Sequence, residues 1–264
     1  MSKDKVKTET KNVPTVKNDS AVAVTDGEMP EFLQKLKGST RGRENVGVED
    51  LVIPRLEVVQ ALSPARKRTD PNYIEGAEEG QLYNNVTREL YGTSVLLCPV
   101  GYVKEWLLWK DRDKGGGFGG AYATEAEANA AKEEREDGED FEVVDTGQQF
   151  CLIIKPDGTS EEIVVSMAKS KAKVSRRWNS LIRLSNTDSF ARVYKIITVP
   201  EQNSKKQDYW NISVAQAGFP TEALFAKAEK LYKTIAAGHA KVNRDFEDVD
   251  TSGASGEARE GRDY

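Results

Sequence analysis

The sequence predicts a mainly β, α+β fold: a small antiparallel Greek-key barrel with an inserted helix, a C-terminal helix and disordered ends. Three observations lead to this prediction. Short apolar runs with β-type alternation recur through the middle of the chain, turn residues separate them, and both ends are polar. The chain has 264 residues, and the roughly 190 between its polar ends are enough for one domain with a sizeable core.

The first 45 residues are predicted to form a disordered arm. Residues 1–28 are polar and contain no aromatic residue, so they cannot bury enough apolar area to offset the entropy lost on ordering. A short helix is predicted near 30–37, because Pro30 suits a first helical position and Gly38 follows the end. A single domain is then expected over 46–240.

The first strands are predicted between residues 51 and 109. Leu51–Leu62 has strand composition, although Pro54 restricts it to a sheet edge or a strand start. Ser94–Val100 is a strong strand. It is followed by Tyr102–Trp109, in which Tyr102, Lys104 and Trp106 share one face and Trp109 lies on the other.

An acidic insert, 123–145, is predicted to interrupt the sheet. Before it, five glycines between 115 and 120 indicate a mobile loop that carries Phe118 and Tyr122. Thr124–Arg135 is predicted as a charged helix with Thr124 at its N-cap. The insert holds ten acidic and two basic residues, a net charge of −8.

Two hairpins and a helix are predicted to complete the domain. The tetrapeptide Pro156–Thr159 indicates a hairpin turn, because its Asp-Gly pair supplies the positive φ angles that such turns need. A C-terminal helix is predicted from Pro220 to about Ala240, before an acidic disordered tail over 241–264. The predicted strands after the acidic helix are Phe141–Val144, Gln149–Lys155, Glu162–Ser166, Ser189–Val199 and Asp208–Ala217.

The most basic stretch, Met167–Leu184, is predicted to be an amphipathic helix. Val174, Trp178, Leu181 and Ile182 fall on one face. Lys169, Lys171, Lys173, Arg176, Arg177 and Arg183 lie in the same stretch, which contains no acidic residue. Such a helix can present a solvated polar face and nothing more, or it can face an anion.

Segregation of charge favours the anion. The chain has 38 Lys and Arg against 43 Asp and Glu, a net charge of −5. The insert carries −8 and Asp245–Tyr264 carries −5, so the rest of the chain carries +8. A basic body favours a polyanionic partner, and acidic segments can occupy its surface when the polyanion is absent.

Composition argues against an enzyme, a metal site or a cofactor. The only histidine is His239, and Cys98 and Cys151 stand alone, which excludes zinc sites and histidine-based triads. The GGGFGG run lacks the GK[ST] of a phosphate-binding loop. Asp111 and Asp113 stand among basic residues and are interpreted as surface ion pairs. No signal peptide or membrane span is predicted, so a cytoplasmic location is expected.

Basic residues interleaved with aromatic ones predict binding of single-stranded nucleic acid, which requires cations along the phosphates and rings on which bases stack. Stacking contributes ~1–3 kcal/mol per base and tolerates any base sequence. Some of these rings are expected to be core instead. The predicted contacts are Tyr102, Lys104, Trp106, Lys110, Arg112, Lys114, Phe118, Tyr122, Lys169, Lys171, Lys173, Arg176, Arg177, Trp178, Arg183 and Lys195.

The runs IPRLEVVQALSPARK, IEGAEEGQLYN and EWLLWKDRDKGGGFGG, with an acidic tail ending in Tyr264, resemble the single-stranded-DNA-binding proteins of lytic tailed bacteriophages. The resemblance implies an OB-type barrel and a tail that competes with DNA and recruits replication proteins through its terminal aromatic residue. The tail departs from that pattern, since Arg259 and Arg262 dilute its charge and Tyr264 replaces the usual Phe.

The predicted function is sequence-independent coating of single-stranded DNA in phage replication or recombination, in the cytoplasm of an infected bacterial host. Two alternatives stay open. One is a phage structural or assembly protein whose basic helix docks a partner. The other is a transcription or recombination accessory factor that acts mainly through protein contacts. No motif separates DNA from RNA.

Overall fold

The computed structural model describes residues 35, 41, 52–203, 206–236 and 241–242. Contacts divide the chain into two units, Met1–Val46 and Gly47–Tyr264, and the elements below belong to the second. Apart from residues 35 and 41, the predicted N-terminal arm and its helix near 30–37 lie outside the described residues. The same holds for the tail beyond Val242, with Tyr264, and for His239.

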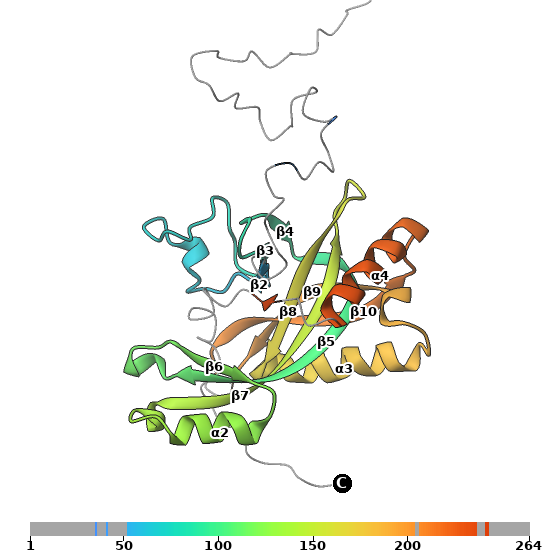
Figure 1. The fold of residues 1–264 in the computed structure, drawn as a ribbon. Coiled ribbons are helices and arrows are strands. Elements are labelled where there is room, and N and C mark those ends of the chain that lie inside the picture. Colours follow the sequence, from blue (N-terminus) through green and yellow to red (C-terminus); the bar gives the residue numbers. More distant parts are fainter. Residues whose placement is uncertain (1–34, 36–40, 42–51, 204–205, 237–240, 243–264) are drawn as a thin grey trace, which may run out of the picture. The chain divides into compact units, whose positions relative to one another are not determined.

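One curved antiparallel sheet of six strands dominates this unit (Figure 1). Its strand order is β10-β9-β5-β7-β8, with β6 paired to the far end of β5. The mainly β, antiparallel prediction is confirmed. The six strands are β5 (Ser94–Lys110), β6 (Phe118–Tyr122), β7 (Phe141–Ile154), β8 (Ser160–Ala168), β9 (Val193–Gln202) and β10 (Asp208–Gly218).

Several predicted strands are parts of longer ones. Ser94–Val100 and Tyr102–Trp109 are one strand, β5, with a register shift between Pro99 and Gly101 where it pairs with β7. A proline has no N–H to donate to a ladder, and a bulge lets the strand continue past it. The two strands predicted at Phe141–Val144 and Gln149–Lys155 are likewise one strand, β7.

The sheet does not close on itself, since β8 and β10 are its two ends. An N-terminal segment that includes β1 (Val52–Ile53) and β2 (Leu56–Val58) contacts both ends. Pro54 accepts a 2.8 Å hydrogen bond from the backbone N–H of Val164 in β8. The side chain of Gln60 donates to the carbonyl of Trp210 (2.7 Å) in β10 and accepts from its N–H (2.8 Å). The predicted closed barrel is therefore an open sheet whose two ends this segment bridges.

A three-stranded antiparallel sheet continues from that segment, with β2 followed by β3 (Leu82–Asn84) and β4 (Leu90–Gly92). A second, two-stranded sheet pairs β1 in parallel with β11 (Lys241–Val242). The strand predicted over Leu51–Leu62 is thus two short strands. The break falls at Pro54 and Arg55, between β1 and β2, and Pro54 has no N–H with which to continue a ladder.

The main core lies inside the curve of the large sheet. Its buried side chains come from all five strands of the path, from β2 and β3, and from α3 (Ala172–Leu184). Trp178 of α3 and Tyr194 of β9 lie within it, with ring centroids 5.9 Å apart. Cys98 and Cys151 are buried and free. The apolar face predicted for the basic helix is therefore confirmed, because Val174 and Trp178 lie in this core and Leu181 and Ile182 pack against it.

Two further helices pack elsewhere on the sheet. In α2 (Glu125–Glu133), Thr124 and Glu127 form a capping box, which confirms Thr124 as the predicted N-cap. α4 (Glu222–Ala236) buries Ala228 and Leu231 against a second cluster that includes Cys98, Val100 and Leu152. The predicted Asp-Gly turn joins β7 to β8, with Gly158 at φ 81°.

Candidate nucleic-acid interface

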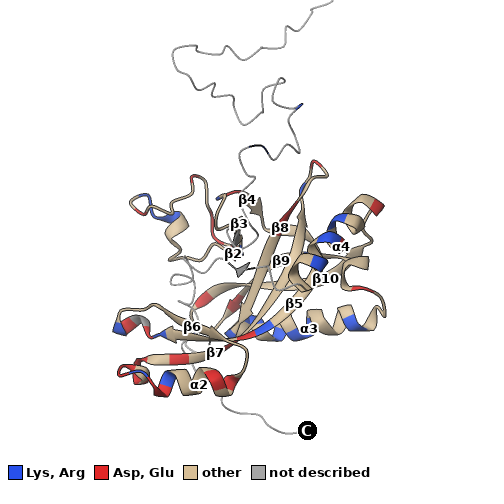
Figure 2. Cartoon of the chain, in the orientation of Figure 1, with Lys and Arg blue, Asp and Glu red and all other residues tan. Residues whose placement is uncertain are grey.

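The structure divides the predicted contact residues between two regions. One is a projection formed by β6, α2 and the adjoining halves of β5 and β7, residues 103–147, which we call the acidic arm. The other is the solvent face of α3. Figure 2 shows acidic residues gathered on α2 and the neighbouring part of β7, and basic residues along α3. Four predicted contacts lie outside both regions: Tyr102 just before the arm, Lys169 and Lys171 in the turn before α3, and Lys195, which is exposed on β9.

Lysines predicted to contact phosphates are paired with carboxylates of the arm. Lys104 Nζ lies 3.1 Å from Asp145 and Lys110 Nζ lies 2.7 Å from Asp137. Lys114 is 3.8 Å from Asp140, and Lys169, just after β8, is 2.6 Å from Glu142. The hydrogen bond from Lys110 is the main cause that lowers the pKa of Asp137. These four lysines are thus already paired with acids of the arm.

Aromatic rings on the arm are only partly exposed. Tyr102, just before the arm, and Phe118 are 41% and 40% exposed. Lys104 lies over the ring of Trp106 at 4.7 Å from the centroid, and the ring of Phe118 lies 5.1 Å from that of Trp109. Neither Trp106 nor Trp109 is fully buried, and neither belongs to a core cluster of the described residues.

The predicted glycine-rich loop is shorter than expected. Only Gly115–Gly117, all with positive φ, lie between the 3-10 helix Arg112–Lys114 and β6. Phe118 and Tyr122 are the first and last residues of β6, and they pair with Trp109 and Trp106 of β5. A side chain at position 119 would place its Cβ 2.6 Å from the ring of Phe141. The glycine there therefore allows close packing rather than mobility.

The basic helix begins later than predicted. Met167 and Ala168 belong to β8, where they pair with Gly147 and Thr146. Lys169 adopts a left-handed backbone (φ 47°) and opens the 3-10 helix Lys169–Lys171, after which α3 starts at Ala172. Within α3, the apolar residues that face the core begin with Val174. Met167 is buried as a strand residue instead.

Trp178 cannot stack on a base. Its side chain is fully buried in the main core. Its neighbours Arg176 and Arg177 are exposed on the other side of the helix, so their closeness in sequence to Trp178 does not place an aromatic ring beside them at the surface. Tyr194 is also fully buried, although the next residue, Lys195, is exposed. A large ring at the centre of an amphipathic face is more often core than ligand contact, and this ring follows that rule.

The solvent face of α3 carries arginines that are not neutralised. Arg176, Arg177 and Arg183 are exposed, and among the described residues none of the three forms an ion pair. Lys171, which is half-buried, also forms none there. Because Val174 and Trp178 hold the opposite face of α3 in the core, the three arginines lie on the solvent side of the helix, while Lys171 lies in the 3-10 turn just before it.

A polar cluster that no sequence motif predicts anchors the N-terminal end of α3. Glu201 of β9 accepts hydrogen bonds from Lys173 (2.8 Å), Tyr209 (2.6 Å) and Asn211 (2.9 Å). Burial alone would raise the pKa of Glu201, but these three hydrogen bonds leave it below its usual range. Lys173 is thus paired with Glu201 in the folded chain.

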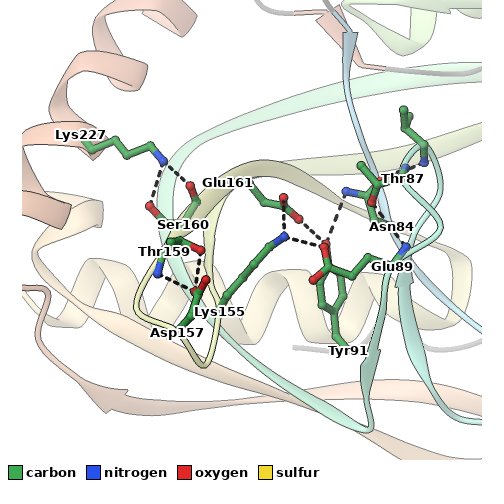
Figure 3. A network of polar contacts seen from close by, with 11 residues as sticks. Asn84, Thr87, Glu89, Tyr91, Lys155, Asp157, Thr159, Ser160, Glu161 and Lys227 are labelled. Atoms are coloured by element: carbon green, nitrogen blue, oxygen red, sulfur yellow. Dashed lines mark hydrogen bonds and ion pairs between the residues drawn. The ribbon is translucent and has the colours of Figure 1, made fainter. Parts of the chain in front are cut away.

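Figure 3 shows a second polar network, which joins the small sheet to the β7–β8 hairpin. Tyr91 of β4 donates to Glu161, and Lys155 lies 2.5 Å from Glu89 and 2.9 Å from Glu161. Burial alone would raise the pKa of Glu161, but hydrogen bonds from Tyr91 and Lys155 lower it. The charged groups of this network pair with one another. This suits a role in holding the three-stranded sheet against the β7–β8 hairpin.

The described part of the chain shows neither a metal-binding cluster nor a membrane-spanning helix. No group of three or more His, Cys, Asp or Glu side chains there is placed to hold a metal ion. None of the helices described is long and apolar enough to cross a membrane.

Comparison with known proteins places the chain in a family. Residues 17–241 match the model of a family described as Pam3 phage gp34-like protein. No curated protein and no solved structure matches the chain. Because the match spans well over half of the sequence, the chain belongs to the family of Pam3 phage gp34-like proteins, a family of phage proteins.

Proposed function

We propose that this phage protein binds single-stranded DNA without sequence preference during replication or recombination. The observation that carries the proposal is the solvent face of α3. Arg176, Arg177 and Arg183 are exposed on it without ion pairs to the described residues. Uncompensated guanidinium groups on one rigid face attract phosphates, and each phosphate contact releases counterions.

The topology of the sheet supports an OB-like assignment. An OB fold is a five-stranded, partly open Greek-key barrel that binds oligonucleotides. Its strands follow the order 3-2-1-4-5, with a helix between strands 3 and 4 in many members. The path β8-β7-β5-β9-β10, with α3 between β8 and β9, follows that order. In this assignment the acidic arm is the expanded loop between the first two strands.

The acidic arm supports a competitive mode of binding. Asp137, Asp140, Glu142 and Asp145 each neutralise one lysine that was predicted to contact DNA. A DNA strand that reached these lysines would displace the carboxylates and put its own phosphates in their place. In the proposed mechanism the arginines of α3 make the first phosphate contacts, and the lysines of the arm contribute only when their carboxylates are displaced.

Titration of the purified chain with oligo-dT, its duplex and oligo-U at several salt concentrations tests the proposal. Tight, salt-sensitive binding to oligo-dT over the duplex is expected. No binding at low salt would contradict it and would favour a phage assembly protein or an accessory factor that acts through protein contacts. Comparing oligo-dT with oligo-U decides between DNA and RNA. We also propose that the chain is not an enzyme and needs no cofactor.

A further inference from the structure

An exposed phenylalanine lies where β10 ends. Phe219 is 72% exposed, whereas Phe190, in the neighbouring 3-10 helix Ser189–Ala191, is buried. The pairing of β10 with β9 shifts register between Gln216 and Gly218. Such bulges re-aim side chains at the ends of strands and next to functional sites. The shift here lies directly before Phe219.

An arginine holds this ring. The guanidinium of Arg192 lies over Phe219 at 4.3 Å from the ring centroid, and Arg192 forms no ion pair within the described part of the chain. One face of the ring is thus occupied by a cation. The exposed remainder of the ring and the positive charge lie together at the surface. Both groups suit a nucleotide, because a base can stack on the ring and a phosphate can meet the cation.

The position connects this pair to α3. Only residues 185–188 and one 3-10 turn separate the end of α3 from Arg192, a span of at most roughly 25 Å. Arg183 lies in the last turn of α3. The end of α3 and the Arg192–Phe219 pair are therefore close enough for one extended polyanion to span the distance between them.

We infer that Phe219, supported by Arg192, is a base-stacking site for single-stranded DNA. The inference rests on the proposed function and adds a residue pair to it. It also supplies the aromatic contact beside α3 that Trp178, buried in the core, cannot make.

Paired substitutions and crosslinking test the site. F219L keeps an apolar side chain but removes the ring, and it is expected to weaken oligo-dT binding about fivefold or more, the low end for losing one stacked base. F219Y keeps the ring and is expected to bind as the unmodified chain does. L184A is the matched control, since Leu184 is 80% exposed at the end of α3 and has no ring. Oligo-dT carrying one 5-iodouracil is expected to crosslink to the peptide that contains Phe219.

The outcomes separate the two proposals. If the unmodified chain does not bind oligo-dT, the proposed function fails and this site fails with it. If the chain binds and R176Q/R177Q weakens binding while F219L does not, the DNA function stands and only the stacking site is overturned. F219L should leave the salt dependence of binding unchanged, because it removes no charge. If F219L instead weakens binding to another protein and keeps its DNA affinity, Phe219 is a protein-docking residue and the inference is also overturned.

Discussion

The acidic arm and α3 both carry clusters of basic residues, but the two clusters are in different electrostatic states. On the arm, Lys104, Lys110 and Lys114 each lie within 4 Å of a carboxylate from the arm itself. On α3, Arg176 and Arg177 are exposed and form no ion pair among the described residues. The number of cations in a segment is therefore a poor guide to its affinity for a polyanion, because the nearby acids decide how much charge remains uncompensated.

The aromatic residues of the two regions differ in the opposite sense. On α3, Trp178 is wholly within the core, while the rings of Trp106 and Phe118 on the arm are partly exposed. Between the arm and α3, the free cations and the accessible rings thus lie in separate regions, whereas Arg192 and Phe219 bring the two groups together. Four variants can break or sharpen this comparison.

The largest expected effect is on stability and comes from the ring of α3. W178A removes a fully buried indole from the main core, and we expect the free energy of unfolding to fall by about 3–5 kcal/mol. Denaturant unfolding measures this change. W106A, on the arm, is the control and should cost much less. If W178A unfolds like the unmodified chain, the position of α3 in the core is wrong.

The next effect is on DNA affinity. R176Q/R177Q removes two uncompensated charges, and we expect oligo-dT binding at low salt to weaken about tenfold or more. Fluorescence anisotropy with labelled oligo-dT measures the dissociation constant. K67Q/R68Q is the matched control, since these exposed residues in the loop after the 3-10 helix Pro64–Arg66 form no ion pair with described residues. Equal weakening in both variants would show a general effect of charge and no site on α3.

A smaller gain is expected from the arm. The variant D137N/D140N/E142Q/D145N releases the four lysines that these acids neutralise. We expect it to bind oligo-dT several-fold more tightly at low salt, with the gain disappearing as salt screens the charges. E133Q/E134Q/E136Q/E139Q changes the charge equally at acids that pair with none of these lysines. A gain of the same size in this control would count against direct competition by the arm.

The smallest effect concerns the anchor of α3. Because the pKa of Glu201 is lower in the folded chain than in the unfolded one, its contribution to stability is present above the unfolded value, ~4.3. It is lost as pH falls through the folded value. E201Q should lower stability at pH 7 by roughly 1–2 kcal/mol and should flatten the decline below about pH 5. E162Q, at an exposed acid of β8, is the control, and a decline as steep in E201Q as in the unmodified chain would contradict the anchor.

Much of the fold could be predicted from the sequence because it depends on local pattern. The Asp-Gly turn, the N-cap at Thr124 and the apolar face of α3 all follow from residues close together in the chain. The union of Ser94–Val100 with Tyr102–Trp109 could not be predicted in that way. It depends on a partner strand, β7, that pairs across the bulge at Pro99 and Gly101.

The candidate site was less predictable, because its charge balance is set by contacts between distant segments. Lys169 and Glu142 are 27 residues apart, and Lys173 and Glu201 are 28 apart. Nothing in the local sequence indicates that these lysines are paired. Phe219 and Arg192 likewise meet only because β9 and β10 are neighbours. A basic run predicts where cations lie, but only the fold shows which of them remain free.

The measurement that tests the central claim most directly is the salt dependence of oligo-dT binding in two triple variants. R176Q/R177Q/R183Q removes three uncompensated charges. The slope of log K against log salt should then fall by about 2, because each phosphate that a cation neutralises on a single strand contributes roughly 0.7 to it. K104Q/K110Q/K114Q removes three charges that are already paired, and its slope should change much less. Equal slopes in the two variants, or a larger fall in the arm variant, would contradict the assignment of the DNA-binding face to α3.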